Sequence, residues 1–115
     1  MKQTEDLVVQ ITSDSYGSNS DGLGENLMKS YIYALTETKP RPDTMLFINR
    51  GAYLTAEDSP VLDSLKQLEE EGTKILTCGT CIDFFELSKT PQAGAVTNMY
   101  NIAERLNNAR NTVVI

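Results

Sequence analysis

Two cysteines in one short segment are the residues of this sequence best suited to chemistry. Cys78-Gly79-Thr80-Cys81 holds both cysteines of the 115-residue chain, which contains no histidine. The lack of histidine excludes Ser-His-Asp and Cys-His mechanisms, as well as metal sites with histidine ligands. Two thiolates also cannot complete a four-thiolate zinc site within one chain. The chemistry that remains is that of the cysteine thiolate itself.

The residues around the pair are expected to place Cys78 where a strand runs into a helix. Lys74–Thr77 has strand character and leads directly to Cys78, and a short helix is predicted to begin near Thr80. At a helix N-terminus the pKa of a cysteine falls, because unpaired backbone N–H groups and the helix dipole favour negative charge. Gly79 permits a tight turn and the close approach of a ligand. Thr80 can cap the helix or hydrogen-bond a sulfur, and Cys81 can point back towards Cys78.

Three functions are possible for this pair, and the alternative is that both cysteines are only structural. The pair can exchange between dithiol and disulfide as in thioredoxin-like proteins, although that fold usually places its pair after an early strand. It can bind a metal between two subunits. Cys78 can carry sulfur as a persulfide, which requires an exposed nucleophilic thiolate and backbone N–H groups. The spacing and the position of the two cysteines favour a function over a structural role.

The segments that must position this pair alternate between strands and helices. Strands are predicted at Leu7–Ile11, Thr44–Ile48, Lys74–Thr77, Gly94–Val96 and Thr112–Ile115. Helices are predicted to begin near Asp21, at Ser59-Pro60, near Thr80 and at Thr97 or Asn98. Their core-facing residues are expected to be Leu23, Leu27, Tyr31, Leu35, Val61, Leu62, Leu65, Leu68, Ile82, Phe85, Met99, Ile102, Ala103 and Leu106, with Phe84 as a further candidate. This alternation predicts one α/β domain over residues 1–115, with a parallel sheet that helices cover on both faces.

Reactive groups in such a sheet collect at the carboxyl ends of the strands. Three loops are expected to meet there, Ser13–Ser20, Asn49–Ala56 and Cys78–Thr80, and Thr97-Asn98 lies at the end of the next strand. Hydroxyl-rich loops after a first strand hold the FMN phosphate in flavodoxins, but Asp14 would repel a phosphate, so we expect a capped polar connection rather than a flavin site.

Four residues of these loops are candidates for contacts with a substrate. They are Gly79, Thr80, Asn49 and Asn98. The alternative for Asn49 is a turn, and the alternative for Asn98 is a helix cap.

The charge balance restricts the partners of the chain. The chain has ten Lys and Arg residues and sixteen Asp and Glu residues, which gives a formal net charge of -6. This excess of acidic groups argues against a sequence-independent nucleic-acid binder and against docking on an anionic membrane. No apolar run has the length of a membrane span. The polar start of the chain, Met1–Asp6, has no signal-peptide core, so a cytoplasmic protein with reduced thiols is expected.

Several motifs, in their order along the chain, resemble the DsrE/DsrF-like superfamily. The likeness is closest to the DsrE-like domain of the YedF-type, selenium-metabolism-associated sulfurtransferase-like proteins, and it covers nearly the whole chain. The segments that carry it are Leu23–Lys29, Ser59–Leu62, Ile75–Cys81 and Val96–Tyr100.

The resemblance implies both a fold and a reaction. The fold would be a flavodoxin-like three-layer α/β arrangement of about five mainly parallel strands, assembled as a homo-oligomer. The reaction would be the carriage of sulfur or selenium as a persulfide on Cys78, with Cys81 as a second thiol and with no cofactor or metal. Proteins of the closest group often carry a TusA-like domain before this one, whereas this sequence starts directly at the DsrE-like domain. The partner would be a sulfur donor or acceptor protein, such as a separate TusA-like one, unless that domain is not needed. The alternatives are a non-catalytic oligomeric interaction module and a dithiol redox protein.

Overall fold

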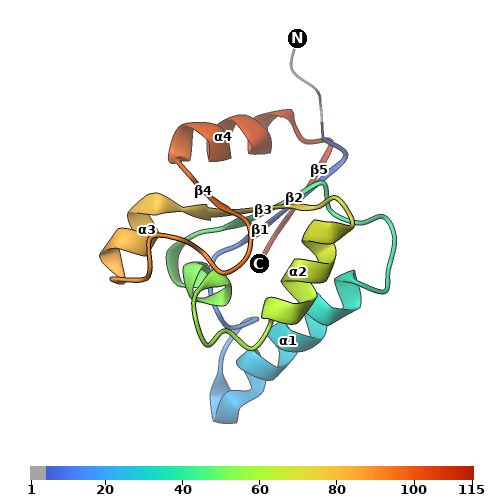
Figure 1. Ribbon diagram of the computed structural model, residues 1–115. Helices are drawn as coiled ribbons and strands as arrows, with labels where there is room; N and C mark the ends of the chain where they lie inside the picture. The colour runs from blue at the N-terminus through green and yellow to red at the C-terminus, as the bar shows by residue number, and fades with distance from the viewer. Residues whose placement is uncertain (1–4) are drawn as a thin grey trace.

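Five strands form one parallel sheet in the order β4-β3-β2-β1-β5 (Figure 1). The strands are β1 (Leu7–Ile11), β2 (Thr44–Phe47), β3 (Lys74–Cys78), β4 (Ala95–Thr97) and β5 (Asn111–Val114). The helices are α1 (Leu23–Leu35), α2 (Leu62–Glu70), α3 (Gly79–Phe84) and α4 (Met99–Asn108), with 3-10 turns η1 (Ser20–Gly22) and η2 (Asn49–Thr55). The predicted α/β flavodoxin-like fold is confirmed.

The structure is a computed structural model that describes residues 5–115. The first four residues of the polar start, Met1–Thr4, lie outside the described residues. Within residues 5–115, no helix combines the length and the apolar character needed to cross a membrane.

The strand order explains which face of the sheet each helix covers. The chain steps outward from β1 to β4 and then returns across the sheet to β5, which lies beside β1. Crossovers between parallel strands are right-handed, so a reversal of direction moves the connecting segment to the opposite face. Figure 1 accordingly shows α1 and α2 on one face, here called the first face, and α4 on the other, the second face.

Each face of the sheet has its own hydrophobic cluster. Successive side chains of a strand point to opposite faces, so β1, β2 and β3 contribute to both clusters. The first-face cluster contains Val9, Ile11, Met28, Ile32, Met45, Phe47, Leu54, Val61, Leu65, Leu68, Ile75 and Ala93. The second-face cluster is smaller and contains Val8, Leu46, Cys78 and Ile102. Cys78 is therefore part of the core beneath α4.

The buried stripe of α1 is displaced by one residue from the predicted one. The prediction is wrong for Leu23 and Leu27, which are 54% and 43% exposed. The residues of α1 that are buried instead are Gly24, Met28 and Ile32. Tyr31 and Leu35 pack at the edge of the first-face cluster.

A close contact at Gly24 explains this rotation of α1. A Cβ atom on Gly24 would overlap Ser15 Oγ and would lie 2.7 Å from the carbonyl oxygen of Ser18. The N–H of Tyr16 also donates to the carbonyl of Gly24 at 2.9 Å. The loop after β1 therefore packs directly on the helix backbone at Gly24, and the residues one and two turns later face the core.

The inner face of α4 also differs from the prediction. Ile102 is buried and Leu106 packs against the second-face cluster, as predicted. Met99 is 57% exposed and Ala103 is exposed, so the prediction is wrong for these two. Arg105 is partly buried in their place, because its Nη1 donates to Glu5 Oε1 at 2.9 Å and to Thr44 Oγ1 at 3.1 Å.

The start of α2 lies two residues after the predicted one. Ser59 Oγ accepts a hydrogen bond from the N–H of Val61 at 3.3 Å, and Val61 is the N-cap of the helix. Ser59-Pro60 thus forms the turn that leads into the helix rather than its first residues. Gly72 follows the helix with a φ of 108°, which is the backbone conformation that glycine adopts most readily.

The displaced stripe of α1 predicts different stabilities for two neighbouring variants. Met28→Ala removes a side chain with no solvent exposure and should lower the free energy of unfolding by about 2–5 kcal/mol. Leu27→Ala, its matched control, should lower it by about 1 kcal/mol or less, because 43% of Leu27 is already exposed to water. Urea unfolding followed by circular dichroism measures both values. A larger loss for Leu27→Ala than for Met28→Ala would contradict the placement of α1.

Candidate functional site

The loops that follow β1, β2 and β3 meet at the carboxyl edge of the sheet, as predicted. A salt bridge joins the first loop to the second, with Arg50 Nη2 3.2 Å from Asp14 Oδ2. A hydrogen bond joins the second to α3, because the N–H of Asn49 donates to Cys81 Sγ at 3.0 Å. The end of β4 lies beside the end of β3, where Thr97 pairs with Cys78.

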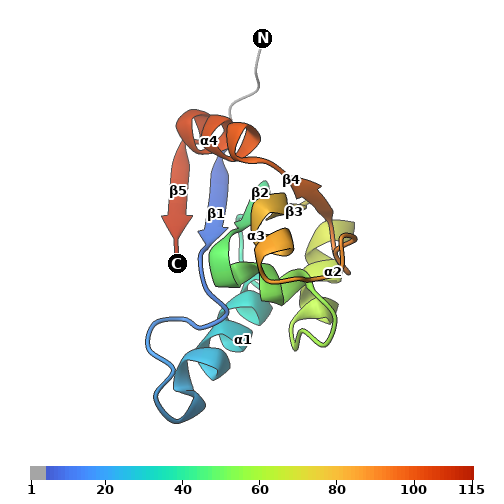
Figure 2. The same cartoon turned by 90° about the vertical axis from the view of Figure 1, so that its left-hand side faces the viewer.

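The cysteine pair lies where the chain leaves two neighbouring strands towards opposite faces. After β3 and α3 the chain returns along the first face, where Ala93 joins the larger cluster and the N–H of Gln92 donates to the carbonyl of Thr55 at 2.8 Å. After β4 the chain enters α4 and crosses the second face (Figure 2). Ligands of open α/β sheets bind at such a switch point in the topology. The fold therefore places both cysteines at the switch point of the sheet.

The two thiols differ in their access to solvent. Cys78 is the last residue of β3 and is only 3% exposed. Cys81, in the first turn of α3, is partly exposed and packs at the edge of the second-face cluster. Both cysteines are free. The exposed thiolate expected at Cys78 is thus not found in this structure, and the thiol that solvent reaches is Cys81.

The helix after the cysteine begins earlier than predicted. Cys78 is the N-cap of α3 and Gly79 is its first residue, so the exposed Thr80 does not cap it. A Cβ atom on Gly79 would lie 3.1 Å from Val96 Cγ1 and 3.5 Å from the carbonyl oxygen of Thr97. Gly79 therefore lets α3 pack closely against β4.

Asn49 contributes its backbone, rather than its side chain, to the surroundings of the cysteines. Its φ of 52° lies in the left-handed region, which asparagine tolerates better than most residues. Its N–H points at Cys81 Sγ, while the residue itself is exposed. The structure thus places Asn49 beside the cysteine pair. Asn49 also forms a turn, which was the alternative predicted for this position.

Three interactions act on the pKa of Cys81. Burial of the thiol raises the pKa above the ordinary value, because the thiolate loses water. The N–H of Asn49 acts in the opposite direction, because it stabilises the thiolate. The neighbouring Cys78 thiol raises the pKa again through a hydrogen bond and through charge repulsion. The balance is a raised pKa, so the resting form of Cys81 near neutral pH is the thiol.

Asn98 lies at the end of β4 and acts as a helix cap. Its side chain accepts a hydrogen bond from the N–H of Asn101 at 2.9 Å and caps α4. Asn101 in turn donates from Nδ2 to Thr97 Oγ1 at 2.6 Å. The cap that was the alternative for Asn98 is confirmed, and its contact with a substrate stays a prediction.

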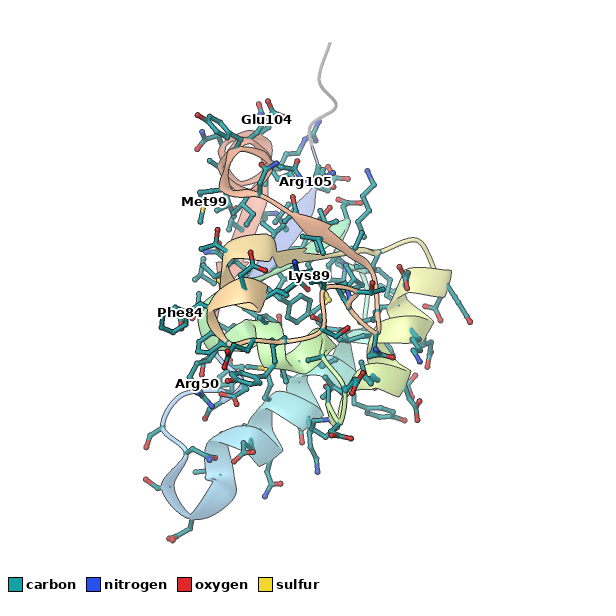
Figure 3. The ribbon with its side chains drawn as sticks, turned by 60° about the vertical axis from the view of Figure 1, so that its left-hand side comes forward. Arg50, Phe84, Lys89, Met99, Glu104 and Arg105 are labelled. Atoms are coloured by element: carbon teal, nitrogen blue, oxygen red, sulfur yellow. The ribbon has the colours of Figure 1, made fainter. Side chains whose placement is uncertain are left out.

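Arg50 and three aromatic side chains lie in a row near Cys81, and the sequence pattern indicated no role for Arg50. The Arg50 guanidinium lies 4.9 Å from the centre of the Tyr53 ring, which lies 4.9 Å from the Phe85 ring. Phe84 meets Phe85 edge to face at 5.2 Å and is 78% exposed, so a core position for Phe84 is wrong. Figure 3 shows Arg50, Phe84 and Met99 along one edge of the molecule. The only sequence signal for Arg50 was its position next to Asn49, at the end of a strand.

A pair of buried hydroxyls ties this region to the sheet. Thr55 Oγ1 and Thr77 Oγ1 lie 2.7 Å apart, and both side chains are buried. Thr55 ends η2, and Thr77 immediately precedes Cys78. The turn that carries Asn49 is therefore anchored to the strand that carries the cysteines.

A cavity of about 260 Å³ lies away from the cysteines, between α1 and the segment from η2 to α2. Its lining combines apolar side chains such as Met28 and Leu54 with the charged groups of Asp14, Glu25, Lys29, Glu57 and Asp58. Within residues 5–115, no group of three or more His, Cys, Asp or Glu residues is arranged to hold a metal ion.

The different environments of the thiols predict different rates of alkylation. With iodoacetamide under native conditions, Cys81 should be modified before Cys78, because Cys78 is buried. The rate at Cys81 should rise with pH with a midpoint above that of a free cysteine, because burial raises its pKa. Peptide mass spectrometry against pH measures both sites, and unfolding in urea should abolish the difference. Faster modification of Cys78 in the native state would contradict this geometry.

Comparisons with known proteins show the fold. No family model matches the chain, and no curated protein matches its sequence. The ychN protein from E. coli has a similar crystal structure, with a TM-score of 0.74 at 15% identity over 96% of this chain and 99% of that one. MTH1491 from Methanobacterium thermoautotrophicum matches with a TM-score of 0.70 at 13% identity over 96% of this chain and 98% of that one. BT1422 from Bacteroides thetaiotaomicron matches with a TM-score of 0.65 at 16% identity over 96% of this chain and 95% of that one. The latter two are described as proteins of unknown function, and the chain shares the fold of all three.

Proposed function

We propose that this protein carries sulfane sulfur, or selenium, bound covalently to its cysteine pair. The observation that supports this most directly is the pair of free, neighbouring thiols at the switch point, with a backbone N–H directed at one sulfur. A persulfide carrier needs a nucleophilic sulfur and a hydrogen-bond donor for the sulfur anion, and it needs no histidine. The resemblance to sulfur-relay proteins names Cys78 as the holder of the persulfide and Cys81 as the second thiol.

The reaction would be the transfer of one sulfur atom between thiols. A cysteine thiolate attacks the outer sulfur of a donor persulfide, and a new S–S bond forms as the donor S–S bond breaks. The donor leaves as a thiolate with the electron pair of the broken bond and takes up a proton. An acceptor thiolate then attacks the outer sulfur of this protein's persulfide, takes that sulfur and releases the cysteine of this protein as a thiolate. No electrons are gained or lost overall, so the transfer needs no redox cofactor.

The partners in this proposal are other proteins of a sulfur relay. The protein would belong with the DsrE-like, YedF-type sulfurtransferase-like proteins and act in the cytoplasm as a homo-oligomer. A separate donor or acceptor, such as a TusA-like protein, would supply or take the sulfur. Exposed apolar side chains beside the site offer contact area for such a partner, with Phe84 78%, Met99 57% and Tyr100 90% exposed.

A dithiol redox reaction is the second candidate, because both cysteines are free and Cys81 packs against the cluster that contains Cys78. In that reaction the pair would reduce a partner disulfide, form a Cys78–Cys81 disulfide and release two partner thiols. It differs from sulfur carriage in that two electrons leave the protein.

Sulfur carriage predicts a gain of mass. After incubation with a cysteine desulfurase and cysteine, the wild-type chain should gain one sulfur atom, seen by intact mass spectrometry without reductant. The gain should be reversed by dithiothreitol, because the sulfur is held in an S–S bond. A variant with both Cys78→Ser and Cys81→Ser should gain none.

The control for this experiment is an authentic sulfur carrier loaded in parallel. The proposal fails if that carrier gains sulfur and this chain does not. A chain that gains no sulfur, but loses two hydrogen atoms with oxidised glutathione, would support the dithiol reaction instead.

A further inference from the structure

The burial of Cys78 raises the question of how sulfur would reach it. Its side chain is 3% exposed and packs with Val8, Leu46 and Ile102 under α4. A donor persulfide must bring its outer sulfur into bonding contact with the attacking sulfur, so a buried thiol is a poor first acceptor. Cys81 is partly exposed and packs against the cluster that contains Cys78. It is therefore the thiol of the pair that a donor reaches from solvent.

The sulfur of Cys81 is held by one backbone group. The N–H of Asn49 donates to Cys81 Sγ at 3.0 Å, although the two residues are 32 positions apart in the sequence. A hydrogen bond between elements this far apart in the chain exists only because the turn after β2 and the helix after β3 pack together.

The turn that carries this N–H is fixed on both sides of Asn49. The N–H of Ile48 donates to the carbonyl of Ile11 at 3.0 Å, and the N–H of Gly51 donates to the carbonyl of Ile48 at 2.9 Å. A Cβ atom on Gly51 would overlap the carbonyl oxygen of Ile11, so the turn sits directly on β1. Arg50 is tied to Asp14 by a salt bridge. These contacts hold Asn49 in its left-handed conformation and aim its N–H at the sulfur.

We propose that sulfur enters the protein at Cys81 and passes inward to Cys78, and that the backbone N–H of Asn49 is the group that positions the Cys81 sulfur. This inference rests on the proposed sulfur carriage and adds the order of the two thiols. Cys81 is the receiving residue, Cys78 is the holding residue, and Asn49 is a positioning residue.

Both steps balance without an added oxidant or reductant. In the first, the Cys81 thiolate attacks the outer sulfur of a persulfide R–S–SH, which forms Cys81–S–SH and releases R–S⁻ to take up a proton. In the second, the Cys78 thiolate attacks the outer sulfur of Cys81–S–SH. That attack forms Cys78–S–SH and returns Cys81 as a thiolate, to which the N–H of Asn49 donates a hydrogen bond.

The order of the thiols is tested with glutathione persulfide as the donor. In the wild-type chain, rapid quenching and peptide mass spectrometry should find the extra sulfur on Cys81 first and on Cys78 after a lag. Cys81→Ser should load Cys78 about tenfold or more slowly, because the exposed nucleophile is gone. Cys78→Ser and Cys78→Ala should both accumulate the extra sulfur on Cys81. The wild-type time course needs no variant, so it stays informative if a serine at the buried position prevents folding.

These outcomes separate the two proposals. Extra sulfur on neither cysteine of the wild-type chain would overturn sulfur carriage itself. Loading of Cys78 in Cys81→Ser at the wild-type rate, or without a lag in the wild-type chain, would overturn the order and leave carriage intact.

The role of Asn49 is tested by a pair of substitutions at that residue. Asn49→Gly keeps the left-handed backbone, whereas the β-branched side chain of Asn49→Val disfavours it and should move the N–H away from the sulfur. Loading of Cys81 in Asn49→Val should fall about tenfold or more below that in Asn49→Gly, the effect expected for loss of one hydrogen bond to a charged group. The pH midpoint for alkylation of Cys81 should also rise in Asn49→Val, because the N–H stabilises the thiolate.

A matched control lies at Asp21, which is exposed and has a φ of 53°. Asp21→Val introduces the same strain in the loop before α1, so it should leave both the loading of Cys81 and its alkylation profile unchanged. An unchanged alkylation midpoint in Asn49→Val, or equal loading in Asn49→Val and Asn49→Gly, would overturn the positioning role.

Discussion

All five strands of this protein run in the same direction, so every connection between them must cross a face of the sheet and every strand ends at the same edge. The handedness of these crossovers fixes the rest of the layout. Three connections in one direction cover the first face with α1, α2 and the segment after α3, and the single return to β5 leaves α4 on the second face. At the ends of the neighbouring strands β3 and β4, the chain leaves β3 towards the first face and leaves β4 towards the second face. The cysteine pair lies there because Cys78 is the last residue of β3.

The same layout gives the two thiols different environments. Cys78 points to the second face and is buried among Val8, Leu46 and Ile102, whereas Cys81 lies one turn further on, at the edge of that cluster. The only hydrogen bond that the structure gives to either sulfur from a different loop comes from Asn49, among the described residues. An inner thiol and an outer thiol with a fixed donor form an ordered pair rather than two equivalent nucleophiles.

The likeness to ychN, MTH1491 and BT1422 extends over nearly the whole chain, but at 13% to 16% identity it concerns the fold. A fold of this kind hosts many functions, so the argument for sulfur carriage rests on the site. The site offers two free thiols, a backbone donor and exposed aromatic side chains, and the sequence has no histidine for acid–base catalysis. The proposed thiol-to-thiol transfer uses the two thiols and the backbone donor, and it needs no histidine.

The sequence by itself determined the order of strands and helices, the parallel sheet and the meeting of three loops at one edge. These follow from local patterns, because apolar runs such as Leu7–Ile11 and Lys74–Thr77 alternate with helical segments, and such alternation has few topological solutions. It also placed both cysteines at the end of the third strand. Periodicity alone could not determine the rotation of each helix. In α1 the stripes through Leu27 and Met28 are both apolar, and the contact of Gly24 with a loop from another part of the chain decides between them.

Only the tertiary structure decided which thiol faces solvent and what binds its sulfur. The sequence pattern favoured Cys78 as the exposed nucleophile, because that prediction depended only on the strand before Cys78 and the helix after it. The burial of Cys78 comes from α4, which lies later in the chain and packs over the end of β3. The donor to Cys81 is a backbone N–H, which every residue except proline possesses. The residue types in the sequence therefore do not predict this hydrogen bond. Its direction depends on the left-handed turn at Asn49 and on the packing of Gly51 against β1, which are properties of the folded chain.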